Sequence, residues 1–319
     1  MGLYGRVGDL WQVDTELCSM RERVLQTCYR LFPFELRGDC QIPDSSDGVE
    51  LSCIINFYGR INLLEGILYS LQEQNFPSNL FEIILIEDQG GTEAGRAAVE
   101  RFSKGLPIRY LPLDKNYGHM GYSRNFGLAH SRGEYILFLD DDTVLLQNHF
   151  LSTLITEFES NPQADALAPH GSASFSLIAG RYNFHDPYFM TSRCTAYRRG
   201  VLAHLGGFVG DFIGQEDVEF VVRFAIAGKK SRNIPALNYF HPPLLVPNFR
   251  KPMAVGYSFS LLKNRYSTIV WLLVVLNCAR QAPLYLVPIR RFREMGRFGI
   301  GFLAGVIVSL FKKKGFRYS

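Results

Sequence analysis

The chain has 319 residues, of which 47% are hydrophobic, and this can supply the core of one large domain or of two modest ones. The formal net charge of +4 is too small to predict nucleic-acid binding, so no nucleic-acid partner is expected. The charge is uneven, because residues 280–319 carry nine Lys or Arg side chains and a single acid, Glu294. A basic segment on an acidic body favours an anionic partner surface.

The six cysteines are scattered, without a C-x-x-C pair and without metal-ligand spacing, which is typical of free thiols in a reducing compartment. The first twelve residues lack the apolar core of a signal peptide, so we expect a cytoplasmic protein. Two apolar stretches, 269–279 and 298–311, are each shorter than a bilayer span. Basic residues bracket the second stretch, so residues 269–319 are expected to lie peripherally on the inner face of a membrane; a helical cap or an oligomer contact is the alternative.

The elements in chain order predict an α/β domain between two helical ends. Residues 10–32 repeat apolar side chains at helical spacing, and a polar linker follows at 41–48. From residue 49, apolar runs typical of strands covered on both faces alternate with helical periodicity, which predicts a mostly parallel sheet. Strands are predicted at 49–59, 81–88, 108–113 and 135–142, with helices at 61–74, 93–105 and 121–131. Turn-rich stretches at 160–165, 169–174 and 183–188 predict irregular structure, and a helix at 216–228 follows.

Polar side chains stand where three of the predicted strands end: residues 56–60, 87–88 and 140–142. In open α/β sheets the ligand binds beyond the carboxyl ends of the strands, so these groups are expected to share one edge. Three consecutive aspartates, Asp140 to Asp142, repel one another unless a cation joins them. Mg²⁺ or Mn²⁺ takes such oxygen ligands and is often shared with substrate phosphates. The alternative is a solvated turn or a helix cap.

Several segments resemble family 2 glycosyltransferases. "LSCIINFYGRINLLEGILYSLQEQNFP" is similar to the opening strand, loop and helix of that family, and "FEIILIEDQGGT" to its second strand. "KNYGHMGYSRNFGLAHSRGEYILFLDDDT" is similar to the central family passage nearly throughout. "SRCTAYRRGVLAHLGGF", "GQEDVEFVVRFAIAG" and "HPPL" follow in the family's order. The resemblance extends from about residue 50 to residue 246.

The resemblance implies a Rossmann-like domain of the GT-A type with a mixed, mostly parallel central sheet. It also implies a division of the chain into an N-terminal helical extension and linker (1–48), a catalytic domain (49–246) and a C-terminal helical tail (247–319). Within the catalytic domain, residues 49–145 would form the nucleotide-binding half and residues 146–246 the acceptor-side half.

The resemblance also implies site residues. Asp217 would be the general base with Glu216 beside it, and Asp142 the main metal ligand, joined by Asp140 and His241. Donor-binding residues would be Asn56, Tyr58, Asp88, Arg124, Asp140 and Asp141, the last two through ribose or sugar hydroxyls. The cofactor would be Mn²⁺ or Mg²⁺, and the donor a nucleotide-diphosphate sugar, with UDP as the expected nucleotide. The acceptor would be a glycan, a lipid-linked glycan or a small molecule. Ordinary structural roles remain open for Arg124, His241 and the Glu216–Asp217 pair.

The expected reaction is an inverting transfer, in which the metal stabilises the leaving diphosphate and Asp217 accepts the proton of the attacking hydroxyl. Two departures from the family pattern lie in the nucleotide pocket: Glu87 stands at the first position of the usual Asp-Asp pair, and 56–59 read Asn-Phe-Tyr-Gly. Two alternatives stay open. One is a haloacid dehalogenase-type phosphatase using Asp140 and Asp142. The other is a nucleotide-sugar-binding protein without turnover.

Overall fold

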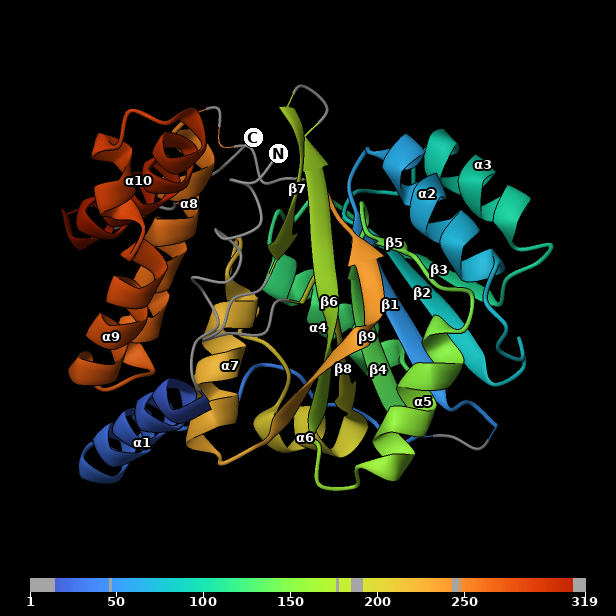
Figure 1. Cartoon of the computed structure of the whole chain (residues 1–319), viewed down its shortest axis with the longest axis horizontal. Coiled ribbons are helices and arrows are strands. Elements are labelled where there is room, and N and C mark those ends of the chain that lie inside the picture. The colour runs from blue at the N-terminus through green and yellow to red at the C-terminus, as the bar shows by residue number, and fades with distance from the viewer. Residues whose placement is uncertain are drawn as a thin grey trace, which may run out of the picture.

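The computed structural model of the chain describes residues 15–45, 48–175, 178–184, 192–242, 246 and 248–311. Within them, nine strands form one mixed sheet in the order β3-β2-β1-β4-β8-β6-β9-β5, with β7 paired to β6 (Figure 1). The first four strands in this order run parallel, whereas β8 pairs antiparallel with both β4 and β6. The strands are β1 (Leu51–Phe57), β2 (Phe81–Glu87), β3 (Ile108–Pro112), β4 (Tyr135–Asp140), β5 (Val144–Leu145), β6 (Ala166–Phe175), β7 (Ile178–Phe184), β8 (Cys194–Arg198) and β9 (Ser231–Phe240).

The helices form when their apolar faces pack on this sheet or on one another. The predicted helices at 61–74, 93–105, 121–131 and 216–228 are present, three of them ending earlier than predicted and the one at 121–131 shifted by one residue, and the N-terminal helix is described from Thr15 onward. Residues 10–14 of that prediction lie outside the described residues. The helices are α1 (Thr15–Leu31), α2 (Ile61–Gln72), α3 (Glu93–Phe102), α4 (Met120–His130), α5 (Phe150–Ser160), α6 (Arg199–Leu205), α7 (Glu216–Ile226), α8 (Arg250–Ser258), α9 (Thr268–Ala279) and α10 (Arg290–Phe311), with the 3₁₀ helices η2 (Phe259–Asn264) and η3 (Ala282–Leu286).

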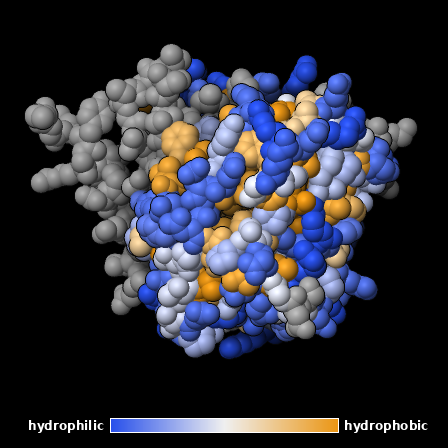
Figure 2. All heavy atoms as spheres, turned by 90° about the vertical axis from the view of Figure 1, so that its right-hand side faces the viewer, coloured by the Kyte–Doolittle hydropathy of each residue, from blue (hydrophilic) through white to orange (hydrophobic). Residues whose placement is uncertain are grey.

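Both faces of the parallel strands are covered, which explains their uninterrupted apolar runs. On β1, Cys53 and Ile55 belong to a cluster shared with α2, α3 and α5, whereas Ile54 belongs to a cluster shared with α4, α6 and α7. Successive side chains of a strand point to opposite faces, so one strand serves both clusters. The outer surface over α2 and α3 is mostly hydrophilic, with hydrophobic side chains scattered between polar ones (Figure 2).

A third cluster joins the two ends of the chain. Leu25 of α1 packs with Val222 of α7, Val270 of α9 and Phe302 of α10. Helices α8 and α10 approach closely because both present glycines: a Cβ at Gly256 or Gly305 would lie 2.0 Å from a backbone oxygen of the other helix. The helical C-terminal part and α1 therefore lie together on the α7 side of the sheet (Figure 1).

Two expectations from the sequence are wrong. Residues 169–174 are not a turn but part of β6, because pairing with β9 and β7 outweighs their weak strand preference. The two apolar stretches are also longer than expected. Segments Thr268–Leu286 and Phe292–Phe311, of 19 and 20 residues, are long and apolar enough to cross a membrane by length and composition, because η3 extends the first and α10 begins at Arg290. In the most apolar 18-residue window of each segment, 39% and 33% of the residues are buried.

Candidate active site

Sheet register brings the predicted site residues of the strand ends together. Asn56 of β1 lies beside Asp140 of β4, and Phe57 of β1 lies beside Glu87 of β2. Because these strands are parallel and their residues pair in register, their carboxyl ends lie at the same edge of the sheet. The three aspartates follow directly, with Asp140 as the last residue of β4.

Each aspartate of the trio has a basic neighbour in the folded protein. Asp140 lies 3.1 Å from Nη2 of Arg124 and 3.5 Å from Nε2 of His241. Nε2 of His241 also lies 2.9 Å from Oδ1 of Asp142, while Nη1 of Arg60 donates to Oδ2 of Asp142 at 2.7 Å. Nη2 of Arg60 donates to Asp141. Three basic side chains therefore offset the mutual repulsion of the carboxylates, and two of them, Arg60 and His241, are distant from the trio in sequence.

Burial and these neighbours shift the pKa values of the three aspartates in different directions. Burial alone would raise the pKa of Asp140, but His241 and Arg124 lower it to about 2. Burial likewise opposes ionisation of Asp142, yet His241 holds the pKa of Asp142 below its usual value. For Asp141, burial raises the pKa to about 7 although Arg60 opposes the shift. Burial would lower the pKa of His241, but Asp140 and Asp142 raise it to about 9.

Asp140, Asp142 and His241 fit a divalent cation. Each offers one ligand atom, and these atoms lie within 4.8 Å of one another. The buried Oδ1 of Asp142 lies 2.9 Å from Nε2 of His241, so a cation that binds this oxygen would also lie next to the imidazole nitrogen. Nδ1 of His241 lies 2.5 Å from the carbonyl oxygen of Pro242, an arrangement that orients the ring and leaves Nε2 toward the carboxylates. Two carboxylates and an imidazole form a donor set that Mn²⁺ accepts readily.

Arg124 is not a surface cation but a buried side chain that forms ion pairs with both Asp140 and Glu216. Its side chain is only 6% exposed and lies 2.9 Å from Glu216 through Nε as well as 3.1 Å from Asp140. Nη1 donates to the carbonyl oxygen of Ser192 at 3.2 Å. Burial would lower the pKa of Arg124, but the acids around it, Glu216 first, raise it. Arg124 therefore connects the end of β4 to the start of α7.

The predicted base lies at the first turn of α7, where the helix dipole favours negative charge. Oδ1 of Asp217 accepts from the backbone N–H of Val218 at 2.8 Å, and Oδ2 accepts from that of Ser192 at 3.2 Å. Asp217 is half-buried and Glu216 is buried. Burial raises the pKa of Asp217, and it raises that of Glu216 to about 7 although Arg124 opposes the shift. A base with a raised pKa accepts a proton more readily near neutral pH.

The backbone before this pair is strained. Gln215 has φ 63°, the only positive φ of a non-glycine among the described residues. Such a conformation costs on the order of 1–3 kcal/mol and persists only where the surroundings impose it. Here it turns the chain so that Glu216 enters α7 facing Arg124.

The remaining predicted donor residues take different positions. Asp88 follows β2, and its two oxygens accept from the backbone N–H groups of Tyr117 and Gly118 at 2.8 and 2.9 Å. Asn56 donates to the sulfur of Met120 at 3.5 Å, while its Oδ1 is buried without a hydrogen bond to the described residues. Tyr58 is 55% exposed. The three residues border the same edge, and of the three only Tyr58 presents a largely exposed side chain.

Sequence reasoning assigns no role to two residues that contact the site. The position of Arg60 after β1 puts it at this edge of the sheet, but nothing in the sequence indicates that it reaches Asp141 and Asp142. Ser192, just before β8, contacts both Arg124 and Asp217 through its backbone. Backbone contacts do not depend on the side chain, so no residue pattern identifies Ser192.

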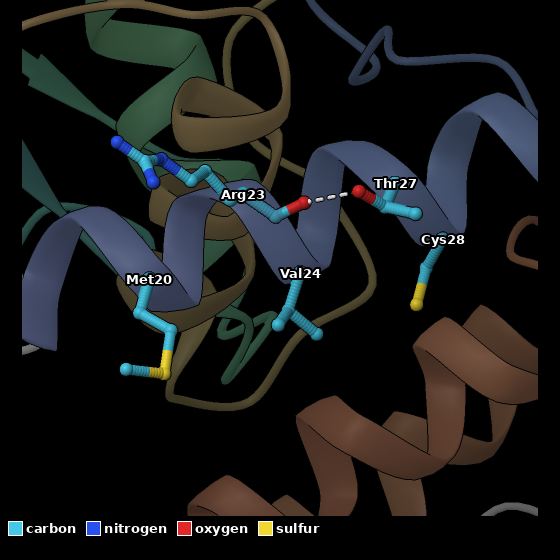
Figure 3. Close-up of a pocket in the computed structure, with 5 residues that line it drawn as sticks. All are labelled: Met20, Arg23, Val24, Thr27 and Cys28. Carbon is cyan, nitrogen blue, oxygen red and sulfur yellow. Dashed lines mark hydrogen bonds between the residues drawn. The ribbon is translucent and has the colours of Figure 1, made fainter.

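A surface hollow lies away from these residues, along α1. Figure 3 shows Met20, Val24 and Cys28 projecting from one side of this helix and Arg23 from another. The hydroxyl of Thr27 donates to the carbonyl oxygen of Arg23 at 2.7 Å, closing one helical turn. The hollow contains none of the predicted site residues.

Comparisons with known proteins concern the family and the fold of the chain. Residues 52–204 match the model "Glycosyl transferase family 2". Over 94 residues the chain is 31% identical to the poly(ribitol-phosphate) beta-N-acetylglucosaminyltransferase TarS of Staphylococcus aureus, a segment that covers 30% of this chain and 16% of TarS. Over 109 residues it is 37% identical to the GalNAc(5)-diNAcBac-PP-undecaprenol beta-1,3-glucosyltransferase of Campylobacter jejuni, covering 33% of each. The alignments thus span a third or less of these relatives.

Solved structures agree over a larger part of the chain. The mannosyltransferase PcManGT from Pyrobaculum calidifontis, in complex with GDP-Man and Mn²⁺, aligns with a TM-score of 0.59 at 15% identity, covering 94% of this chain and 98% of that one. Residues 1–349 of S. aureus TarS, in complex with UDP-GlcNAc, align with a TM-score of 0.55 at 17% identity, covering 81% of this chain and 82% of that one. At such identities the likeness concerns the fold, which is of the GT-A type. Together with the sequence match, it establishes that residues 52–204 form a glycosyl transferase family 2 domain.

Proposed function

We propose that this protein transfers a sugar from a nucleotide-diphosphate donor to an acceptor hydroxyl with the help of a divalent metal. The observation that carries the proposal is the joined pair of acidic groups: Asp140, Asp142 and His241 as a metal donor set, and Glu216 with Asp217 as a base. Arg124 links the two. The parallel half of the sheet, residues 49–145, binds the donor, and the half from 146 to 246 faces the acceptor.

The residues of the chain divide the work of this reaction. Asp140, Asp142 and His241 would hold Mn²⁺ or Mg²⁺, which supplies Lewis-acid stabilisation to the leaving diphosphate. Asp217, half-buried and with a raised pKa, accepts the proton of the attacking hydroxyl. Attack on the side opposite the leaving group inverts the anomeric centre. NMR of the product from an α-linked donor should therefore show a β linkage, and an α-linked product would contradict a single displacement.

The nucleotide and the acceptor are proposed from chemistry and from the relatives. Asp88, Asn56 and Tyr58 line the nucleotide side of the edge, and Asp140 and Asp141 lie where ribose or sugar hydroxyls would reach. UDP is the expected nucleotide, and structural neighbours bound to UDP-GlcNAc or to GDP-Man support a sugar nucleotide of this kind. Relatives named for poly(ribitol-phosphate) and for an undecaprenol-linked glycan support a glycan or lipid-linked acceptor.

A thermal-shift screen of UDP-, GDP-, CMP- and dTDP-sugars, each with Mn²⁺ or Mg²⁺, would identify the donor, because a ligand that binds only the folded state raises Tm. Transfer or slow hydrolysis of that donor is then measured in wild type and in Asp217→Asn. Removing a general base should lower kcat by about 10²- to 10⁴-fold, with little change in donor affinity. Donor binding without any turnover would favour the non-catalytic alternative. Phosphate release from p-nitrophenyl phosphate would favour the phosphatase.

We also propose that the C-terminal helices associate peripherally with the inner face of a membrane. Ile269, Leu272 and Leu276 form an exposed stripe on α9 at helical spacing, and Ile307, Leu310 and Phe311 form another on α10. Arg290, whose side chain is 83% exposed, lies at the start of α10 and can meet anionic headgroups.

The membrane proposal is tested with point variants, because deleting α10 would remove the buried Phe302 and open the helical cluster. The variant Leu272→Gln/Leu276→Gln should sediment less with vesicles of phosphatidylglycerol and phosphatidylcholine. Leu146→Gln, with 54% exposure near β5, is the matched control. If the double variant and the control sediment like wild type, the stripe on α9 does not bind membranes.

A further inference from the structure

The loop between β1 and α2 places a cation directly on the aspartate trio. Gly59 has φ 67°, which lets the chain turn sharply after β1, and Arg60 follows as the residue that caps α2. Its guanidinium forks across two carboxylates: Nη1 donates to Oδ2 of Asp142 at 2.7 Å, and Nη2 donates to Asp141.

Arg60 is the most exchangeable of the three cations around the trio. Arg124 is 6% exposed and is held by Glu216 and Ser192 as well as by Asp140. His241 is 10% exposed and belongs to the metal donor set itself. The side chain of Arg60 is 52% exposed, and among the described residues its guanidinium makes hydrogen bonds only to Asp141 and Asp142. A long, half-exposed side chain can leave its partner without disturbing the core.

Both oxygens of Asp142 face a basic side chain in this arrangement, Oδ1 toward His241 and Oδ2 toward Arg60. A divalent cation that binds Asp142 must therefore compete with at least one of them. His241 can remain as a ligand through Nε2 once it loses its proton, whereas a guanidinium stays charged and cannot coordinate a metal. Electrostatic repulsion between a metal ion and the adjacent guanidinium then favours release of Arg60.

We propose that Arg60 is an internal counter-ion that competes with the divalent cation for Asp142 and, once displaced, binds the diphosphate of the donor. A guanidinium fork matches two phosphate oxygens as well as it matches two carboxylates. The exchange would keep the trio neutralised without the metal and would couple metal binding to donor binding. This inference rests on the proposed function, because it takes the metal and the diphosphate as ligands of this edge.

Calorimetric titration of Mn²⁺ into the full-length protein without nucleotide tests the competition directly. Arg60→Gln removes the competing charge, so Mn²⁺ should bind about three- to tenfold more tightly than in wild type. Arg60→Lys keeps the charge without the fork and should give an intermediate affinity. Arg101→Gln is the matched control, since Arg101 is 51% exposed and pairs with Glu65 on the surface, away from the site. It should bind Mn²⁺ like wild type.

A second titration, with UDP and with GDP at saturating Mn²⁺, tests the transfer to the diphosphate. Arg60→Gln should bind whichever nucleotide the wild type binds about tenfold more weakly, because a charge-assisted hydrogen-bond partner is lost. If Mn²⁺ affinity is unchanged or weaker in Arg60→Gln, or if neither protein binds Mn²⁺, the competition is refuted. If only nucleotide affinity is unchanged, transfer to the diphosphate is refuted. Neither titration needs sugar transfer, so an absence of transfer activity would refute only the transfer step of the proposed function, whereas the metal and diphosphate binding on which this inference rests is measured separately.

Discussion

Replacing Arg124 by Gln tests the central contact of the site, because it removes the cation that Asp140 and Glu216 share. The side chain is 6% exposed, so water cannot replace the lost charge. Breaking a buried ion pair from one side costs about 3–5 kcal/mol, since the remaining charges stay buried without compensation. Partial hydrogen bonding by Gln favours the lower end, and we expect a loss of about 3 kcal/mol in the free energy of unfolding at pH 7.

The loss should depend on pH in a defined direction. Burial raises the pKa of Glu216 to about 7 even with Arg124 present, and without Arg124 it should rise further. Above pH 7 the wild type then carries an ionised Glu216, whereas the variant must keep the proton or bury an unpaired charge. The destabilisation should therefore grow by up to about 1.4 kcal/mol per pH unit between pH 7 and pH 8.5.

Urea unfolding at pH 7 and at pH 8.5 measures both effects, and an unchanged m-value would show that the transition stays comparable. The control Arg101→Gln breaks a surface pair and should cost at most about 1 kcal/mol. In the double variant Arg124→Gln/Glu216→Gln the buried charge is removed together with its partner, so its cost should fall below the sum of the single costs. If Arg124→Gln lowers the free energy of unfolding by less than about 1 kcal/mol, or if the costs in the double-mutant cycle are strictly additive, Arg124 does not form a stabilising buried ion pair with Glu216.

Three further predictions concern the trio, the metal and the packing around the site. Asp141→Asn should gain stability relative to wild type as pH rises from about 4 to about 7, because burial raises the pKa of Asp141 to about 7 and ionising it costs the folded wild type up to about 4 kcal/mol. Urea unfolding at pH 4.5 and pH 8 measures this gain, and a stability difference that stays constant with pH would contradict it. Mn²⁺ affinity should rise between pH 6.5 and pH 8.5, because the carboxylates raise the pKa of His241 to about 9 and a proton then competes with the metal. Calorimetry at three pH values should show this rise in wild type and no rise in His241→Gln. Gly121→Ala should lower the free energy of unfolding by about 1–3 kcal/mol, because its Cβ would lie 2.0 Å from the carbonyl oxygen of Val209. Gly200→Ala is the control and should not show this loss, because nothing lies within 4 Å of a Cβ at Gly200.

Sequence reasoning predicts the parts of the site that depend on local pattern. An apolar run followed by polar residues is typical of a buried strand with a polar end, so the residue pattern alone predicts approximately where β1, β2 and β4 end. The first turn of α7 follows from the same logic, since Glu216 and Asp217 stand where a helix dipole favours acids. The antiparallel half is harder to predict, because residues 169–174 acquire strand structure only by pairing with β7 and β9.

The sequence by itself determined the parallel α/β half, the acidic strand end and the family resemblance, because hydrophobic periodicity and short motifs are local properties of the chain. Only the tertiary structure decided which cation meets which acid. Arg60, Arg124 and His241 come from three separate elements, up to 181 positions apart, and reach the trio through sheet register and helix packing. Charge pairing depends on distances of a few ångströms and on burial, and neither is encoded by spacing along the chain.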